Sequence, residues 1–371
     1  MNYSFWEKYF IESPSEITII GAGIVGLSTA ISIKERNTGI SVKILERGTS
    51  PNGASTKNAG FSCFGSVSEL LDDIAHIGEE ACMEIVKMRW YGLKKLKERV
   101  GIENMEYQHV GGTELFDKND RQTFERCRTH IAQLNEMIAA QLEIKDCYSV
   151  QNNQCLNAFH DQHIFNAYEG IINPVKMMQA LHSIAVQMGV HIFYGHSVDN
   201  INIAEHTLST DTGLNIFFKK LILCTNGFTK RLFPEMEVYP ARNQVLMTKP
   251  LPGNPLNSGY HFDRGYIYFR QYQGRILLGG GRNMDLSGET TDAFGHTNAI
   301  QDYLRERLEL IYPGASDQID CWWSGIMGIG TSKKPLTEWL NADILTGVRL
   351  GGMGVAIGSH LGGQLAEMIF D

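Results

Sequence analysis

The sequence predicts a mixed α/β protein in which a discontinuous Rossmann-like unit is combined with an antiparallel sheet and helices. Three observations predict this class. An apolar strand at residues 17–20 leads into a glycine-rich turn and a helix, and residues 170–228 again carry a helix followed by a buried strand. Residues 229–324 carry short alternating strands separated by turns. This order predicts a parallel sheet assembled from separated stretches of chain, with an antiparallel sheet built from the segments between them.

The opening unit, residues 17–46, has the pattern of a dinucleotide-binding turn. Gly21, Gly23 and Gly26 form a G-x-G-x-x-G motif directly after the strand. The first glycine permits the tight turn, the second lets the backbone approach a pyrophosphate, and the third lets the helix pack closely on the strand. The helix N-terminus favours the negative phosphate. Glu46 ends the second strand, where its carboxylate can accept hydrogen bonds from both ribose hydroxyls of an adenosine.

Length and composition exclude several classes of protein. A chain of 371 residues with 43% hydrophobic residues predicts two closely packed domains. The net charge of −8 provides no concentrated basic face, which argues against a nucleic-acid partner. The seven cysteines form no C-x-x-C pair, and neither an export signal nor a transmembrane segment is visible, so we expect a cytoplasmic protein with reduced thiols. His160 and His163 lack a third ligand nearby, so no metal site is predicted.

The middle of the chain predicts helices and one loop of interest. The small and polar loop 53–61 is either a linker or a ligand cradle. A long helical pattern with breaks covers 68–99, with Ser68 as its N-cap, and a second helix covers 120–141. Asn173 and Pro174 predict the start of a third helix. The buried strand 221–224 then ends in a turn of small residues.

The last third of the chain alternates in the manner of an antiparallel sheet. Strands are predicted at 238–247, 266–271 and 275–280, with a helix over 299–310. Residues 348–358 form a strand, a glycine turn and the start of a helix that runs through Phe370. This second glycine-rich junction is another place where backbone N–H groups can contact a ligand.

Four separated stretches together resemble the FAD-dependent oxidoreductases of the D-amino-acid oxidase superfamily, which includes glycine and sarcosine oxidases and γ-glutamylputrescine oxidase-like enzymes. These stretches are the Gly21–Gly26 motif with Glu46, the loop 53–60, the strand and turn 221–227, and the terminal glycine turn 351–358. Together they frame nearly the whole chain.

The resemblance implies a discontinuous FAD-binding domain over residues 1–84, 168–228 and 325–371, and a substrate domain over 85–167 and 229–324. Cys321 lies too early, relative to the following turn, to match the covalent flavin cysteine of sarcosine oxidases, so we expect non-covalent FAD. The residues that the resemblance assigns to the cofactor are Gly21, Gly23, Ile24, Val25, Gly26, Glu46, Arg47, Ser55, Asn58, Ala59, Gly60, Val198, Thr225, Gly227, Gly352, Met353, Gly354 and Val355.

The chemistry that the resemblance implies is oxidation of the C–N bond of an amine or amino acid, by hydride transfer to flavin N5, to an imine that water hydrolyses. A small amine is the expected substrate, and oxygen or a quinone is the expected electron acceptor. The candidate catalytic residues are Tyr268, Arg270 and Met327. Related sarcosine oxidases place a lysine over the flavin to promote reaction with oxygen, and Tyr268 stands in the most similar strand here, which predicts slow reoxidation by oxygen.

The departures from the family concern the substrate. Met327 replaces the arginine that binds the substrate carboxylate in amino-acid-oxidising relatives, and no lysine follows the terminal glycine turn. Two alternatives follow. Either Arg270, Arg242 or Lys333 reaches the substrate from another direction, as in a D-amino-acid or glycine oxidase, or the substrate is a secondary or ω-amine. The second alternative is favoured, because an unpaired buried carboxylate is costly.

Two further classes compete with this interpretation. A nicotinamide-linked dehydrogenase uses the same motif but predicts a continuous N-terminal Rossmann domain up to about residue 150, whereas long helices begin soon after Gly65 here. A flavoprotein that only binds or senses would carry flavin that no amine or hydroxy-acid donor bleaches.

Overall fold

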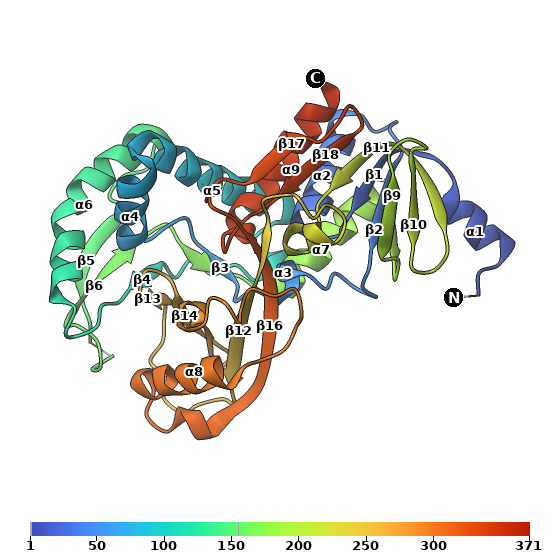
Figure 1. The fold of residues 1–371 in the computed structure, drawn as a ribbon. Coiled ribbons are helices and arrows are strands. Elements are labelled where there is room, and N and C mark those ends of the chain that lie inside the picture. Colours follow the sequence, from blue (N-terminus) through green and yellow to red (C-terminus); the bar gives the residue numbers. More distant parts are fainter. Residues whose placement is uncertain (1, 155) are drawn as a thin grey trace.

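The computed structural model describes residues 2–154 and 156–371, and over these residues the chain forms two eight-stranded sheets, a two-stranded ribbon and flanking helices (Figure 1). The α-helices are α1 Phe5–Glu12, α2 Ile24–Arg36, α3 Ala54–Lys57, α4 Val67–Ile77, α5 Glu79–Val100, α6 Arg121–Leu142, α7 Pro174–Gln187, α8 Asn298–Ile311 and α9 Gly354–Phe370. The 3₁₀-helices are η1 Glu103–Met105, η2 Asn226–Arg231, η3 Arg282–Met284 and η4 Ala315–Gln318.

The strands belong to three sets. The first sheet contains β1 Ser15–Ile20, β2 Val42–Glu46, β8 His191–Tyr194, β9 Val198–Asn202, β10 Thr207–Thr210, β11 Asn215–Leu223, β17 Leu336–Trp339 and β18 Ile344–Val348. The second sheet contains β4 Gly112–Glu114, β5 Tyr148–Asn152, β6 Gln162–Asn166, β12 Tyr239–Thr248, β13 Gly259–Phe262, β14 Ile267–Tyr272, β15 Arg275–Gly280 and β16 Ile319–Ile329. The ribbon pairs β3 Phe61–Ser62 with β7 Gly170–Ile171.

The first sheet gathers the predicted ligand-binding turns at one edge. Its order is β17-β18-β11-β1-β2-β8, and β18, β11, β1, β2 and β8 run parallel. Ile20 pairs with both Leu45 and Leu223 in register. The strands therefore end side by side, and the turns that follow β1, β2, β11 and β18 meet at the carboxyl edge, where open α/β sheets bind their ligands.

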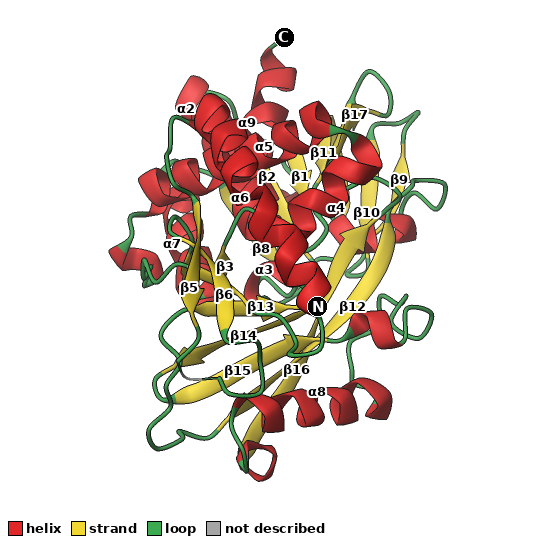
Figure 2. Cartoon of the chain, turned by 90° about the vertical axis from the view of Figure 1, so that its left-hand side faces the viewer, coloured by secondary structure: helices red, strands yellow, loops and turns green. Residues whose placement is uncertain are grey.

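Helices α2, α5 and α9 cover one face of this sheet, as Figure 2 shows. One hydrophobic cluster joins α2, α5, α7 and α9 to the apolar side chains of β1, β2 and β11. A second cluster on the opposite face includes Ile11 of α1 and side chains of β10 and β11. The first sheet is thus the middle layer, and its central strands β1, β2 and β18 are buried along nearly their whole length because both faces are covered there.

The second sheet packs on α8 with one face and turns its other face toward the first sheet. Its order is β16-β12-β15-β14-β13-β4-β6-β5. Leu246, Phe269 and Leu278 pack against Leu304 and Leu308 of α8, which lies below the sheet in Figure 1. Helices α4, α5 and α6 form a separate hydrophobic cluster with the β5–β6 end of the sheet.

Most predicted elements are present, but one N-cap is wrong, and helix α1 and the short helix α3 inside the predicted loop 53–61 were not expected. The pattern over 68–99 is two helices, because Gly78 at φ 84° separates α4 from α5. The N-cap of α4 is Ser66, whose hydroxyl accepts a hydrogen bond from the Glu69 N–H. Ser68 lies inside the helix, and its hydroxyl donates to Glu114 instead. Helix α1 was not predicted from the sequence; the Ser4 and Glu7 side chains form a capping box at its start.

We predict that Gly92→Ala destabilises the fold, because a Cβ at Gly92 in α5 would overlap the carbonyl oxygen of Ala356 in α9. The helices must then separate, at a cost of about 1–3 kcal/mol. Thermal unfolding measures this change. Gly363→Ala in α9 is the matched control, because its Cβ meets only the flexible end of Lys95 and alanine favours a helix. Equal midpoints for the two variants would contradict the close packing of α5 on α9.

Candidate active site

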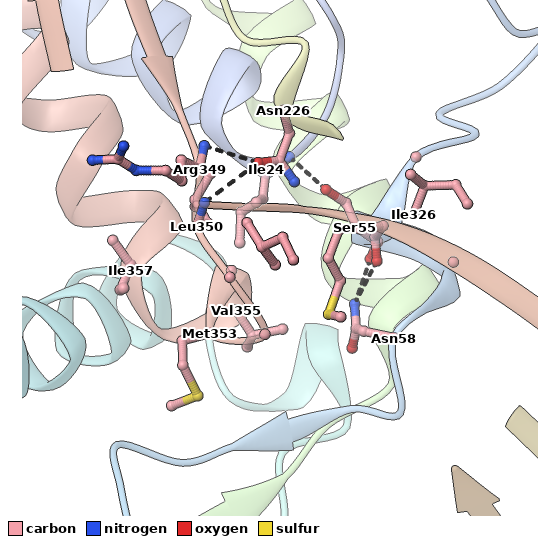
Figure 3. Close-up of a pocket in the computed structure, with 18 of the residues that line it drawn as sticks. Ile24, Ser55, Asn58, Asn226, Ile326, Arg349, Leu350, Met353, Val355 and Ile357 are labelled. Atoms are coloured by element: carbon pink, nitrogen blue, oxygen red, sulfur yellow. Dashed lines mark hydrogen bonds between the residues drawn. The ribbon is translucent and has the colours of Figure 1, made fainter. Parts of the chain in front are cut away.

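A cavity of about 890 Å³ lies between the carboxyl edge of the first sheet and the inner face of the second sheet. Residues of both sheets line it, together with the loops after β1, β2, β11 and β18 and one side of α4 from Glu69 to Ile77. Figure 3 shows the part of this cavity around Ile24, Ser55, Asn226 and Met353. Segments that are more than 300 residues apart in the chain therefore contribute to one site.

The glycine turn places the N-terminus of α2 at the cavity. Gly21 has φ 105°, and a Cβ there would lie 2.7 Å from the carbonyl oxygen of Cys224, so only glycine fits. A Cβ at Gly26 would overlap the carbonyl oxygen of Gly21, so glycine lets α2 start directly on the turn. The Ile24 N–H donates to the Ser55 hydroxyl at 3.0 Å (Figure 3). The remaining first-turn N–H groups have no acceptor within the helix and favour an anion.

Glu46, the last residue of the neighbouring strand β2, forms a hydrogen bond with the glycine turn. One carboxylate oxygen accepts the Ala22 N–H at 2.9 Å and the other accepts the Gly48 N–H at 3.0 Å. Each oxygen keeps a lone pair for a further donor. Arg47 lies beside Glu46 with its guanidinium carbon 3.5 Å from the centre of the Phe228 ring, a cation–π contact at the cavity wall.

The Asn226 side chain connects the turn after β11 to the loop after β18 by hydrogen bonds. Its side-chain oxygen accepts the N–H groups of Arg349 and Leu350 at 3.1 and 3.4 Å (Figure 3). Both Asn226 and Arg349 have positive φ, at 44° and 64°. This connection positions α9, whose N-cap is Met353 and whose first-turn N–H groups provide a second anion-favouring site in the same cavity.

The loop 53–60 reaches the cavity from the side of α2. The Asn58 amide donates to the Ser55 carbonyl at 2.8 Å, and its oxygen accepts the Gly60 N–H at 2.9 Å. Arg270 lies on the side of the loop away from the cavity, where its Nε donates to the Ala59 carbonyl at 2.6 Å. A second guanidinium nitrogen donates to the Ile172 carbonyl at 2.9 Å, and burial lowers the pKa of Arg270 to about 10.

The second sheet contributes an aromatic and a thioether. Tyr268 leans over Gly279, where a Cβ would lie 2.5 Å from the tyrosine ring, and it contacts Phe61 edge to face at 5.7 Å. Burial raises the pKa of the Tyr268 phenol, so it stays neutral. The Met327 thioether lies 3.9 Å from the position that a Cβ on Gly352 would take. Both side chains line the cavity, Met327 against the loop after β18 and Tyr268 against Phe61.

The far end of the cavity carries paired charges. Glu69 accepts from the guanidinium of buried Arg89 at 3.1 Å and from Lys333 at 3.4 Å. Lys333 also bonds Asp73 at 2.6 Å. Glu169 lines the cavity nearby and accepts the Phe64 N–H at 3.0 Å, and burial raises its pKa to about 8.

The structure separates the predicted site residues into two groups. Those that line the cavity are Gly21, Gly23, Ile24, Val25, Glu46, Arg47, Ser55, Asn58, Ala59, Val198, Thr225, Gly352, Met353, Gly354, Val355, Tyr268 and Met327. Gly26, Gly60, Gly227 and Arg270 lie behind this lining. Sequence reasoning missed Asn226, Glu69, Arg89 and His261; a polar residue within an otherwise apolar strand was the available signal for His261.

The family model described as FAD dependent oxidoreductase matches residues 16–368. The chain belongs to this family of FAD-dependent oxidoreductases. A probable oxidoreductase, OrdL, from Haemophilus influenzae is 20% identical, covering 96% of this chain and 83% of the relative.

Two solved structures show the same fold as this FAD-dependent oxidoreductase. L-proline dehydrogenase from P. horikoshii has a TM-score of 0.74 at 18% identity, covering 96% of this chain and 93% of that one. Iminodiacetate oxidase from a Chelativorans species has a TM-score of 0.73 at 19% identity, covering 95% of each chain.

The cavity fits the family's cofactor, FAD. Two helix N-termini face it, and a Cβ at Gly23 would protrude into the lining, 3.1 Å from the Ser55 hydroxyl. Glu46 keeps acceptors for ribose hydroxyls at the neighbouring strand end. Cys321, the cysteine considered for covalent attachment, is exposed and is not part of the cavity lining, in keeping with non-covalent FAD. Within the described chain, the helices are too short or too polar to cross a membrane.

We predict that Gly23→Val abolishes FAD binding while the protein stays folded, because the side chain would occupy the space beside Ser55 where the backbone meets the pyrophosphate. Flavin absorbance per mole of purified protein measures the loss. Gly39→Val, in the exposed turn after α2, is the control and keeps its full flavin content. A folded Gly23→Val protein with full flavin content would refute this placement of the pyrophosphate.

The buried acid Glu169 predicts a pH dependence of stability. Its pKa rises from 4.5 to about 8 on folding, so the folded state binds more protons than the unfolded state between these values. Stability from this group therefore falls as the pH rises from about 4.5 to 8. We expect Glu169→Gln to flatten the decline in unfolding temperature between pH 5 and pH 8, whereas Glu136→Gln, an exposed residue of α6, leaves it unchanged. An unaltered slope in Glu169→Gln would be inconsistent with a buried, protonated carboxyl.

Proposed function

We propose that this enzyme oxidises the C–N bond of a secondary or ω-amine rather than that of a simple α-amino acid. The observation that carries the proposal is that Arg242, Arg270 and Lys333, the three cations expected from the sequence to replace the missing carboxylate-binding arginine, all have other partners. The cavity lining instead includes Met327 and Tyr268, an apolar side chain and a neutral one, at positions where relatives of the family carry charged residues.

Each of the three cations has other partners. Arg242 bonds both oxygens of Glu289 at 2.9 Å, and its neighbour Gln244 bonds the same carboxylate, on the face of the second sheet that packs against α8. Arg270 holds the Ala59 and Ile172 carbonyls. Lys333 lines the cavity but neutralises Asp73 and Glu69. A short substrate carboxylate would have to break one of these pairs, leaving a buried charge unmatched.

Two relatives with the same fold support the secondary-amine class. L-proline and iminodiacetate, the compounds named for these relatives, both have a nitrogen bonded to two carbon atoms. Both also carry a carboxylate on the carbon next to that nitrogen, so these names support the secondary nitrogen and not the absence of a carboxylate. Their identity to this chain is 18% and 19%, so they support the reaction class and not a particular substrate.

Several groups of the chain have roles in this reaction. Bound FAD supplies the hydride acceptor. Tyr268, Phe61 and Val245 form an apolar cover that excludes water and favours the neutral amine from which hydride departs. When FAD is bound, the first-turn N–H groups of α9 would stabilise negative charge on the reduced flavin. The electron acceptor is oxygen or a quinone, and a tyrosine rather than a lysine at position 268 favours slow reoxidation by oxygen.

Anaerobic bleaching of the flavin by a panel of donors tests the proposal. The panel contains secondary amines and ω-amines without a carboxylate on the carbon next to the nitrogen, and the α-amino acids sarcosine, glycine and D-alanine. We expect one of the amines without that carboxylate to reduce the flavin with the highest kcat/KM. Fastest reduction by sarcosine, glycine or D-alanine would contradict it. Lys57 and Arg282, which also line the cavity, would then be the cations to replace. No bleaching by any donor would instead support a binding or sensing flavoprotein.

A further inference from the structure

His261 is a polar side chain of the cavity wall that the proposed reaction does not use. It lies on β13, and its register partner on β14 is Tyr268, so both side chains share the face of the sheet that lines the cavity. Its Nδ1 is enclosed and has no hydrogen-bond partner among the described residues. Burial lowers the pKa of His261 to about 4, so the ring is neutral at physiological pH.

The enclosed Nδ1 determines which nitrogen carries the proton. A neutral imidazole has one N–H donor and one acceptor lone pair. An enclosed N–H without an acceptor is rarer in proteins than an enclosed, underused acceptor. The proton is therefore on Nε2, which is not enclosed in this way, and His261 presents an N–H donor to the cavity.

Glu69 presents the complementary acceptor. One of its carboxylate oxygens receives both the Arg89 and the Lys333 hydrogen bonds, which fix the side chain in place. Burial alone would raise the Glu69 pKa, but Arg89 and Lys333 lower it overall, so the carboxylate is ionised. Its second oxygen has no hydrogen-bond partner among the described residues, and the Glu69 charge acts on His261. A fixed donor and a fixed acceptor thus share one end of the cavity.

We propose that His261 and Glu69 form a subsite for an amide group at the end of the substrate that is not oxidised. The His261 N–H would donate to the amide carbonyl, and the free Glu69 oxygen would accept the amide N–H. This inference rests on the proposed function, because the subsite lies in the same cavity as the flavin position and adds to the substrate a part that the reaction leaves unchanged.

Charge favours an amide over the two ionic alternatives. Within this wall Glu69 and Asp73 are balanced by Arg89 and Lys333, so a neutral group needs no counter-ion. A carboxylate could accept from His261 but would face the Glu69 charge. An ammonium group could bind Glu69 but offers no acceptor to the His261 N–H. An amide satisfies both groups without adding charge.

The test uses N-butylacetamide, which carries the amide but no amine to oxidise, so binding is followed without turnover as a change in the flavin absorption spectrum of the holoenzyme. His261→Phe keeps the ring and removes the donor, and we expect its Kd to rise roughly three- to tenfold. His261→Gln restores an N–H donor and should stay within about twofold of the wild type. If His261→Phe fails to keep FAD, His261→Met, which also lacks a donor, replaces it.

Three results would overturn the subsite: no spectral change with N-butylacetamide in the wild type, equal affinity in the donor-free variant, or equal weakening in His261→Gln. The amine panel tests the proposed C–N oxidation separately from the amide subsite. Amide binding that depends on the His261 donor in a protein that no amine reduces would retain the subsite and contradict only the oxidation. Amine oxidation with amide binding indifferent to His261 would contradict only the subsite.

Discussion

The close approach of α2 and α9 at the carboxyl edge of the first sheet is the constraint on which the rest of the structure depends. It is possible because glycines replace side chains at the contacts. A Cβ at Gly358 would lie 2.7 Å from the Ile24 side chain, and one at Gly362 would lie 2.6 Å from Cβ of Ser28. Gly26 does the same between α2 and its own turn. With these contacts, two helix N-termini separated by some 330 residues of chain point into one cavity.

On the substrate side of this cavity, buried acidic side chains position the backbone by accepting its N–H groups. Glu114 and Glu169 are buried and accept backbone N–H groups of Val67 and Phe64, on either side of the start of α4. Burial raises the pKa of Glu114 to about 7, in line with the neighbouring Glu169. Glu69 is the exception, because Arg89 and Lys333 keep it ionised. The wall is therefore polar and fixed yet carries balanced charge.

The cofactor and the fold class could be predicted from the sequence because local patterns encode them. A glycine that must take positive φ or admit a backbone can be recognised from its neighbours, as at Gly21, and Glu46 stands at a fixed distance beyond the motif. The family match confirms the fold class and the cofactor that these patterns predicted. Asn226 escaped notice because its partners, Arg349 and Leu350, lie 123 and 124 residues away.

The substrate half was less predictable because burial and pairing there depend on tertiary contacts. Arg270 was expected at the substrate, yet its guanidinium binds two carbonyls behind the loop at Ala59. Arg89 reads in sequence as an ordinary helical arginine, and only the packing of α5 on α4 buries it against Glu69. Ser68 and Ser66 are both plausible caps in sequence, and Glu114 from a distant strand decides between them by binding the Ser68 hydroxyl.

The central claim is that this cavity removes hydride from the carbon next to an amine nitrogen. The most direct measurement is the rate of anaerobic flavin reduction by the most reactive amine of the panel, compared with the same amine deuterated at that carbon. Breaking that C–H bond during reduction predicts slower bleaching with the deuterated amine and one imine-derived carbonyl product per flavin reduced. Equal rates together with an unchanged amine after bleaching would contradict the account.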